Sequence, residues 1–381
     1  QLAELFGQRP PEQDAAYPRL SVYQPDRVVR QISFDADPER RLLINIQPVA
    51  AELSAIKSAL DAHLANGGYA LALTNTVQRA QELYRDYGNG EQLVIGGELV
   101  GKRLSDGTEV YLFHARFPAD ARQRREDAVL EIFGPPPLNS HGTRAGRKIL
   151  IATQVAEQSL DLDFDLIATD LAPIDLLLQR AGRLWRHKRG GRLPAAPVLI
   201  IAGLEEDPPP SFGKPLWWCA VYREDVLLRT RSVLRGKPTL RLPDEIDTLV
   251  ASVYEEAVDV EESLEARLDQ AMQDALGKEY AHIGEAHQVL AVPLFDTDPF
   301  DPAVTPVLAQ AKVWFLRAMN LSRKSIVKRL QAQGVPEGWR QSALLRNAYP
   351  LRFDPEARWI EDSQVHLSNE LGLLYESKEI E

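Results

Sequence analysis

Between residues 42 and 203, short apolar runs alternate with stretches in which apolar residues recur every three or four positions. Apolar runs bounded by turn residues are typical of buried strands, and the longer spacing is typical of helices. The pattern predicts strands at 42–49, 69–74, 109–114, 149–152, 166–169 and 198–202, with helices at 52–65, 77–87, 119–133 and after the fifth strand. This alternation predicts an α/β fold, a parallel sheet with helices on both faces whose ligands gather at the carboxyl ends of the strands.

Changes in composition divide the chain into a linker at 1–40, the sheet domain at 41–205, a linker at 206–279 and a small α+β accessory domain at 280–381. Three consecutive prolines at 208–210 mark the second boundary. Apolar residues at intervals of three and four between 246 and 268 predict one long helix with an acidic outer face. The accessory domain is expected to contain a helix at 308–333 and short strands such as 364–367.

Charge is distributed unevenly along the chain. The net charge is −11, but residues 244–279 hold twelve acidic against two basic side chains, so the remainder is close to neutral. Residues 180–192 hold six Arg or Lys and no acid. Local charge is what a phosphate chain senses within a Debye length of about 8 Å. The acidic total therefore does not exclude a nucleic-acid partner.

Several classes of protein do not fit the composition. No run of about eighteen apolar residues suggests a membrane span. The single Cys219 excludes an intrachain disulfide and zinc-finger spacings, and a reducing, cytoplasmic setting is the default expectation. The first residues have neither a signal-peptide pattern nor an initiator Met, so we expect them to be the edge of a longer protein.

Residues 148–187 carry the candidate chemistry. They read as two buried strands joined by a polar loop, followed by a helix that presents Arg180, Arg183 and Arg186. Arginines at a spacing of three are expected to form a staggered fork on one side of that helix. An arginine is almost never fully buried without an anionic partner, so we expect the fork to face outward. Guanidinium groups turned inward and neutralised by their own chain would contradict a motor function.

The strings in this stretch resemble known motifs. Q-R-A-G-R-L-W-R is similar to the sixth motif of superfamily-two helicases, and A-T-Q-V-A-E-Q-S-L-D to the fifth. The longer string, with S-L-D-L-D-F-D and D-L-A-P-I-D ahead of Q-R-A-G-R, resembles the third Cas protein of type I CRISPR systems, a helicase–nuclease that degrades invader DNA. The resemblance implies that residues 41–205 are the second RecA-like helicase lobe, and that 280–381 are the C-terminal domain of that family.

The resemblance also implies roles for the motif residues. ATP is held between two RecA-like lobes in such helicases, and arginines of the second lobe reach across to its phosphates. By motif position, Arg183 is the expected arginine finger and Arg186 a second phosphate contact. Arg180 and Gln179 are expected to brace the nucleotide interface or couple it to the nucleic acid. Asp161 is expected near the ribose or the finger arginine. A finger contributes about 10³ to 10⁵ in rate.

Residues expected to contact nucleic acid follow the strands. Thr153 and Gln154 end one strand at the ligand edge, where a hydroxyl and backbone amides suit a phosphate. Asn75 and Thr76 follow another strand and resemble the family's fourth motif, although Asn or Thr before a helix is also a common N-cap. Both interpretations can hold, because a capped helix start is itself an anion site. Arg116, in L-F-H-A-R-F, is expected to touch the DNA backbone.

Two motif-like strings are rejected. G-G-E-L-V-G-K at 96–102 imitates a phosphate-binding loop, but Arg103 replaces the Ser/Thr that would hold magnesium, and no helix pattern follows. Asp161, Asp163 and Asp165 imitate the start of a calcium loop, but the required glycine and glutamate are missing. No metal site is therefore expected, and Asp163 and Asp165 are interpreted as polar residues of a turn.

The family's other motifs are not found in the sequence. A phosphate-binding loop, an acid pair of the D-E-x-D/H type after a strand in the first hundred residues, and any His-Asp dipeptide are missing. We expect ATP, Mg²⁺ and the nuclease's divalent metal to be bound mainly by a first helicase lobe and a nuclease domain outside this chain. Alone, the chain is expected neither to hydrolyse ATP nor to cut DNA.

The partners implied by the resemblance are single-stranded DNA, the crRNA-guided surveillance complex and the remaining domains of the same protein; no membrane is expected. Two alternatives stay open at this point. The chain could be a lobe of another superfamily-two DNA or RNA helicase. It could also be a non-enzymatic docking module for nucleic acid or protein, whose arginines never meet ATP.

Overall fold

The computed structural model describes residues 17–22, 30–35, 37–38, 41–117, 119–136, 144, 146–157, 160–254, 260–290, 365–368 and 370–375. The chain divides into two compact units, one of residues 1–114 and 124–268, the other of residues 115–123 and 269–381. No helix in the described part is long and apolar enough to cross a bilayer.

A nine-stranded sheet forms the centre of the first unit, in the order β11-β3-β10-β9-β4-β8-β7-β6-β5. Its parallel strands are β3 (Leu42–Val49), β10 (Val198–Ala202), β9 (Leu166–Asp170), β4 (Gly68–Leu73), β8 (Arg147–Ala152) and β7 (Glu109–Phe113). Its antiparallel edge strands are β11 (Thr239–Leu242), β6 (Glu98–Arg103) and β5 (Glu91–Ile95). The predicted parallel sheet is confirmed, because the six predicted strands are its six parallel strands.

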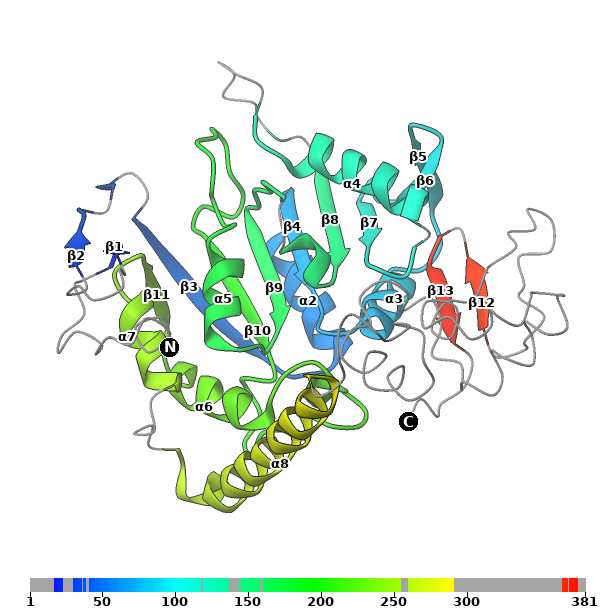
Figure 1. Ribbon diagram of the computed structural model, residues 1–381. Coiled ribbons are helices and arrows are strands. Elements are labelled where there is room, and N and C mark those ends of the chain that lie inside the picture. Colours follow the sequence, from blue (N-terminus) through cyan, green and yellow to red (C-terminus); the bar gives the residue numbers. More distant parts are fainter. Residues whose placement is uncertain are drawn as a thin grey trace, which may run out of the picture. The chain divides into compact units, whose positions relative to one another are not determined.

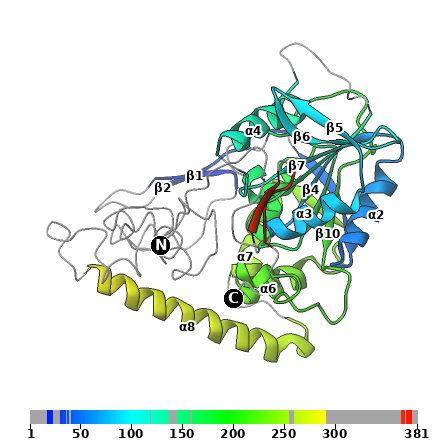
Figure 2. The same cartoon turned by 90° about the vertical axis from the view of Figure 1, so that its right-hand side faces the viewer.

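Helices lie on both faces of this sheet (Figures 1 and 2). On one face α2 (Leu53–His63) and α3 (Val77–Asp86) pack together and against the strands. On the other face α5 (Ile174–Ala181), α7 (Ile246–Tyr254) and α6 (Glu224–Leu234) pack in series. Every residue of β4, β9 and β10 is buried. Their continuous apolar sequence follows from this double cover, which leaves no polar face to alternate with.

The string at 96–102 is part of a hairpin. Gly96 and Gly97 have φ angles of 56° and 78° and form the two-residue turn between β5 and β6. Such turns need positive φ at both positions, which glycine adopts without a Cβ penalty. Lys102 lies in β6, and its Nζ donates to the carbonyl oxygens of Tyr84 and Gly88. Its ammonium therefore does not face a phosphate site, which agrees with the rejection of this string as a phosphate loop.

Residues 206–254, expected to be a linker, contribute β11, α6 and α7 to the first unit. The helix expected across 246–268 is not continuous: α7 ends at Tyr254, residues 255–259 lie outside the described residues, and α8 covers Glu265–Leu290. The predicted range therefore covers α7 and only the first four residues of α8. The period alone does not distinguish one helix from two that bury the same face.

The remaining elements are short. β1 (Arg19–Val22) and β2 (Arg30–Ser33) form an antiparallel pair within the expected N-terminal linker. α4 covers Ala119–Phe133, as predicted. In the second unit, β12 (Val365–Ser368) pairs with β13 (Gly372–Tyr375). The helix expected at 308–333 lies outside the described residues.

The segment that joins β10 to α6 is fixed by an aromatic stack. Trp218 is buried, and its ring stacks on Phe212 with centroids 5.6 Å apart. Arg79 covers Trp218 at 5.6 Å, and Arg267 covers Phe212 at 4.8 Å. Arg267 also donates to two proline carbonyls of the segment. Gly203, at the start of the segment, has a φ of +83° and lies directly against the Trp218 ring.

Gly203→Ala is expected to lower the free energy of unfolding by about 2–4 kcal/mol, because the new Cβ combines left-handed strain with overpacking. A Cβ at this position would lie 2.7 Å from the Trp218 ring. Urea denaturation of the purified chain measures the effect. Gly190→Ala is the matched control, since among the described residues nothing lies within 4 Å of its Cβ position. Equal stabilities of the two variants would contradict the packing described.

Candidate functional site at the carboxyl edge of the sheet

The buried carboxylate of Asp170 organises the carboxyl ends of the central strands. Asp170 ends β9, and its two carboxylate oxygens accept from Arg79, with Nη2 at 2.7 Å and Nε at 3.0 Å. The backbone N–H of Asn75 donates to the same carboxylate at 2.8 Å. Arg79 also donates to the carbonyl of Ala51, after β3. One ion pair therefore ties together the segments that follow β3, β4 and β9.

A second set of contacts joins the loop after β8 to helix α5. The Gln154 amide Nε2 donates to the Asn75 carbonyl at 2.8 Å and to the Tyr222 hydroxyl at 3.1 Å. The same hydroxyl accepts from Nη2 of Arg180 at 3.1 Å. Arg180 in turn forms an ion pair with Glu157 at 2.6 Å. We call these five residues, Asn75, Gln154, Tyr222, Arg180 and Glu157, the edge network.

Arg180 is turned inward. Its side chain is 0% exposed, and besides Glu157 and Tyr222 it donates to Oγ1 of Thr169 at 2.5 Å and to the carbonyl of Asp170 at 3.2 Å. A buried guanidinium requires a carboxylate and filled hydrogen bonds, which this pocket supplies. Arg180 thus braces the carboxyl edge from inside, and the expectation that it faces outward is wrong.

The three motif arginines do not share one helix. α5 ends at Ala181 with Gly182 as its C-cap, and Arg183 lies beyond it. Arg183 is buried and donates to the carbonyl oxygens of Leu160 and Glu157. Burial and then the positive charge of Arg186 lower the pKa of Arg183. The expected outward fork is therefore wrong for Arg183 as well, because the chain leaves the helical path at Gly182.

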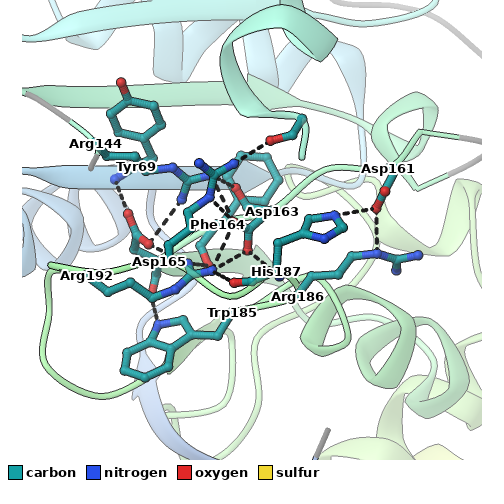
Figure 3. A network of polar contacts seen from close by, with 12 residues as sticks. Tyr69, Arg144, Asp161, Asp163, Phe164, Asp165, Trp185, Arg186, His187 and Arg192 are labelled. Atoms are coloured by element: carbon teal, nitrogen blue, oxygen red, sulfur yellow. Dashed lines mark hydrogen bonds and ion pairs between the residues drawn. The ribbon is translucent and has the colours of Figure 1, made fainter. Parts of the chain in front are cut away.

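Arg186 is the exposed member of the three, with 46% of its side chain accessible. Its Nε binds Asp161 at 2.7 Å, and the same carboxylate oxygen contacts Nε2 of His187 at 3.0 Å (Figure 3). The terminal nitrogens of Arg186 have no partner among the described residues and point away from Asp161. Asp161 thus lies beside one of the arginines, and the guanidinium it orients presents donors to the outside.

The predicted nucleic-acid contacts differ in accessibility. Asn75 is buried, and its Nδ2 donates to the carbonyl of Leu171, so its side chain is not on the surface. Thr76 is the N-cap of α3, and its hydroxyl accepts from the Arg79 N–H at 3.3 Å. Thr153 is buried, while Gln154 is half-buried.

Two further predicted residues remain to be placed. Gln179 is exposed on α5. Arg116 follows β7 in a turn of the second unit and is partly exposed. The carboxyl edge brings together Asn75, Gln154 and Arg180. Arg183 and Arg186 follow α5, and Asp161, which binds Arg186, lies in the connection before β9.

The amino edge of the sheet holds a cluster of buried opposite charges. Asp163 is 0% exposed and binds Arg192 at 2.9 Å (Figure 3). It also binds Arg189 at 2.6 Å. Asp165 accepts from Arg192 at 2.6 Å, and Arg144 lies within 3.3 Å of both carboxylates. Asp163 and Asp165 lie in the connection between β8 and β9, as predicted, but they are buried there in ion pairs. Of the basic run at 180–192, Arg180, Arg186, Arg189 and Arg192 are each paired with a carboxylate.

The sequence analysis assigned no role to several residues that the structure places in the site. Glu157 lies in the loop of the fifth motif and neutralises Arg180. Asp170 and Arg79 are 91 positions apart, and Tyr222 lies beyond the three prolines. An acid at the end of an apolar strand was the available signal for Asp170. Nothing in the sequence pattern pointed to Tyr222.

The hydrogen-bond donors that Arg186 presents at the edge of the site fit a nucleotide phosphate. The two terminal nitrogens of Arg186 have no partner in the described part of the chain, and a guanidinium matches phosphate oxygens in a bidentate manner. Among the described residues, no group of three or more His, Cys, Asp or Glu could hold a metal ion.

Two family models match the chain. One, described as the CRISPR-associated nuclease/helicase Cas3, C-terminal, matches residues 66–189, and the other, the Cas3 C-terminal domain, matches residues 284–373. The CRISPR-associated endonuclease/helicase Cas3 of Thermus thermophilus is 35% identical over 416 residues, which cover 87% of this chain and 44% of that protein. The chain belongs to the Cas3 family. It spans less than half the length of this relative.

Solved structures agree with this assignment. A crystal structure of a CRISPR-associated protein matches this Cas3 chain with a TM-score of 0.69 and 28% identity, over 98% of this chain and 45% of the other. T. fusca Cas3 with AMPPNP gives 0.59 and 28%, over 75% and 33% of the two chains. A pre-nicking CRISPR RNA-guided surveillance complex gives 0.54 and 28%, over 75% and 34%. The large, mainly parallel sheet is thus the fold of the Cas3 helicase lobe, as expected.

Asp163→Asn is expected to lower the free energy of unfolding by about 3–5 kcal/mol, because it removes the carboxylate that binds Arg189 and leaves Arg144 and Arg192 with Asp165 alone. Asp161→Asn, two residues earlier and half-exposed, is expected to cost about 0–1 kcal/mol. Urea denaturation of both variants measures the difference. Similar small losses in both variants would mean that Arg144, Arg189 and Arg192 do not depend on Asp163.

Proposed function

We propose that this chain is the second motor lobe and C-terminal domain of an ATP-dependent Cas3 DNA helicase–nuclease that acts in CRISPR interference. The relatives that support this are named nuclease/helicases, one matching structure contains an ATP analogue, and another is a CRISPR RNA-guided surveillance complex. The single observation that carries the proposal is the outward guanidinium of Arg186, held by Asp161 beside the sixth-motif helix. Single-stranded DNA and the surveillance complex are the proposed partners.

At the nucleotide, the proposed roles combine motif position with geometry. Arg183 remains the proposed arginine finger by its place in the motif, and Arg186 is the proposed second phosphate contact. Asp161 orients Arg186, and Arg180 braces the helix end through Glu157 and Thr169. Bound ATP and Mg²⁺ supply the phosphoryl group and its counter-charge, and both are proposed to be held mainly by a lobe with a phosphate-binding loop. Gln179, exposed on the same helix, is proposed to face that lobe.

At the nucleic acid, the proposed contacts are mainly backbone groups and half-buried side chains. Thr76 and the start of α3 form a capped helix N-terminus, which suits a phosphate. Gln154 and Arg116 are accessible enough to reach a strand directly, whereas Asn75 and Thr153 are proposed to shape their loops from below. Such contacts position a strand without reading its sequence.

One observation favours the non-enzymatic docking alternative. Arg180 and Arg183 are both turned inward, against groups of their own chain. The family membership does not depend on their orientation, but their roles do. Measurement of ATPase activity in a Cas3 protein that joins this chain to a lobe with a phosphate-binding loop therefore decides between the two functions. On its own, the chain is proposed neither to hydrolyse ATP nor to cut DNA.

In that joined protein, Arg183→Ala and Arg186→Ala are each expected to lower DNA-stimulated ATPase by about 10³-fold or more, because a guanidinium stabilises the charge that develops on the phosphoryl oxygens. Arg186 is exposed, so its loss should leave the melting temperature unchanged. Arg85→Ala, which removes an exposed arginine from the last turn of α3, is the matched control. If Arg183→Ala keeps activity within a few-fold of wild type, the finger assignment is wrong.

The type of strand that stimulates ATP hydrolysis tests the proposed DNA substrate. The joined protein is expected to be stimulated by single-stranded DNA at least tenfold more than by RNA of the same sequence. Steady-state ATPase assays with both strands at saturating concentration measure the ratio. Equal stimulation by RNA would contradict the proposed preference for DNA.

Binding of the chain to single-stranded DNA should weaken steeply with salt, because phosphate contacts release counterions.

A further inference from the structure

The hydroxyl oxygen of Tyr222 lies between two loops that the proposed function treats separately. It accepts one hydrogen bond from Gln154, after β8, and one from Arg180, near the end of α5, each 3.1 Å long. Gln154 belongs to the proposed nucleic-acid contacts, and Arg180 braces the helix that precedes the proposed phosphate contacts. The Tyr222 hydroxyl is therefore a hydrogen-bond acceptor common to both segments.

Neither donor has a simple replacement for this acceptor. Arg180 is fully buried, so its Nη2 cannot turn to water. Gln154 is held on its other side by the carbonyl of Asn75, which fixes the direction of its amide. A shift of the β8 loop that moves Gln154 therefore changes the surroundings of the Arg180 guanidinium through a single oxygen atom. Buried donors that lose their acceptor are costly, so the two positions are expected to move together.

The segment that carries Tyr222 is itself firmly placed. It is anchored by the buried Trp218, which packs on Phe212, under Arg79 and against Gly203. Arg79 is the residue that binds Asp170 and so fixes the start of the Asn75 loop. The backbone N–H of Tyr222 donates to the carbonyl of Trp218 at 2.9 Å. The segment that carries the hydroxyl is thus anchored to the strand ends independently of the Gln154 and Arg180 contacts.

Its ionisation state suits this role. Burial raises the pKa of Tyr222, and the charge of Arg180 and the hydrogen bond from Gln154 only partly oppose that shift. The phenol therefore stays neutral and acts as a dipole that accepts from both donors. An anion at this point would compete with Glu157 for Arg180, and a neutral oxygen does not.

We propose that Tyr222 is a positioning residue that couples the nucleic-acid loop at Gln154 to the arginine-bearing helix end at Arg180. This inference rests on the proposed function. It predicts that the hydroxyl is needed for DNA to accelerate ATP hydrolysis, whereas neither substrate contacts it. The proposed coupling depends on two hydrogen bonds to one hydroxyl oxygen, so removal of that atom tests it.

The test is Tyr222→Phe in the joined protein described above, which removes the hydroxyl and keeps the ring. The ratio of DNA-stimulated to basal ATPase rate is expected to fall about tenfold, while the DNA concentration for half-maximal stimulation changes less than threefold. Tyr254→Phe is the matched control, because it also removes a tyrosine hydroxyl that contacts α5, at Asp175. The control ratio should equal that of wild type.

A double-mutant cycle with Gln154→Ala separates positioning from simple loss of structure. If Tyr222 acts through Gln154, Tyr222→Phe adds less than a twofold further loss in the Gln154→Ala background. A wild-type ratio for Tyr222→Phe, an equal fall of basal and stimulated rates, or fully additive losses would each overturn the proposal. The DNA-stimulated ATPase of the unsubstituted joined protein, measured in parallel, reports on the proposed function alone: its absence would refute the motor assignment, whereas a normal rate together with a wild-type ratio for Tyr222→Phe would overturn only the proposal for Tyr222.

Discussion

The central strand β9 depends on buried carboxylates that are paired with arginine at both of its ends. Asp165 precedes the strand and is bound by Arg192, and Asp170 ends it and is bound by Arg79. A carboxylate removed from water is tolerated only with a charged, hydrogen-bonded partner, and removal of either partner is costly. Each arginine comes from a distant part of the chain. These pairs therefore fix the register between the strand ends and the loops that carry the candidate site.

The same constraint decides which arginine already presents donors to the outside in this structure. Arg180 is committed to Glu157 and fully buried, and Arg183 fills two backbone carbonyls. Arg186 is bound through Nε, and its terminal nitrogens have no partner among the residues that the structure describes. In this Cas3 lobe, Arg180 is therefore an internal brace and Arg186 lies at the surface. The Tyr222 hydroxyl connects the buried Arg180 to Gln154 in the loop after β8.

Much of the fold could be predicted from the hydrophobic pattern. The six parallel strands and helices α2, α3, α4 and α5 follow from apolar runs and helical periods, because burial on both faces of a sheet leaves a strong signal in the sequence. The hairpin β5–β6 and the edge strand β11 were missed. Their exposed positions break the apolar runs, and β11 joins the sheet only by pairing with β3, across almost two hundred residues.

For the candidate site, the sequence by itself determined the family, the segment 148–187 and the kinds of residue at the carboxyl edge. Those features are local, because the motif strings and the strand ends lie within a few residues of one another. Only the tertiary structure decided which guanidinium faces outward, that Asp163 and Asp165 are buried ion-pair partners, and that Tyr222 reaches Gln154 and Arg180. Side-chain direction depends on where the helix ends and on which distant charge is available for pairing, and neither is encoded in the spacing of the motif.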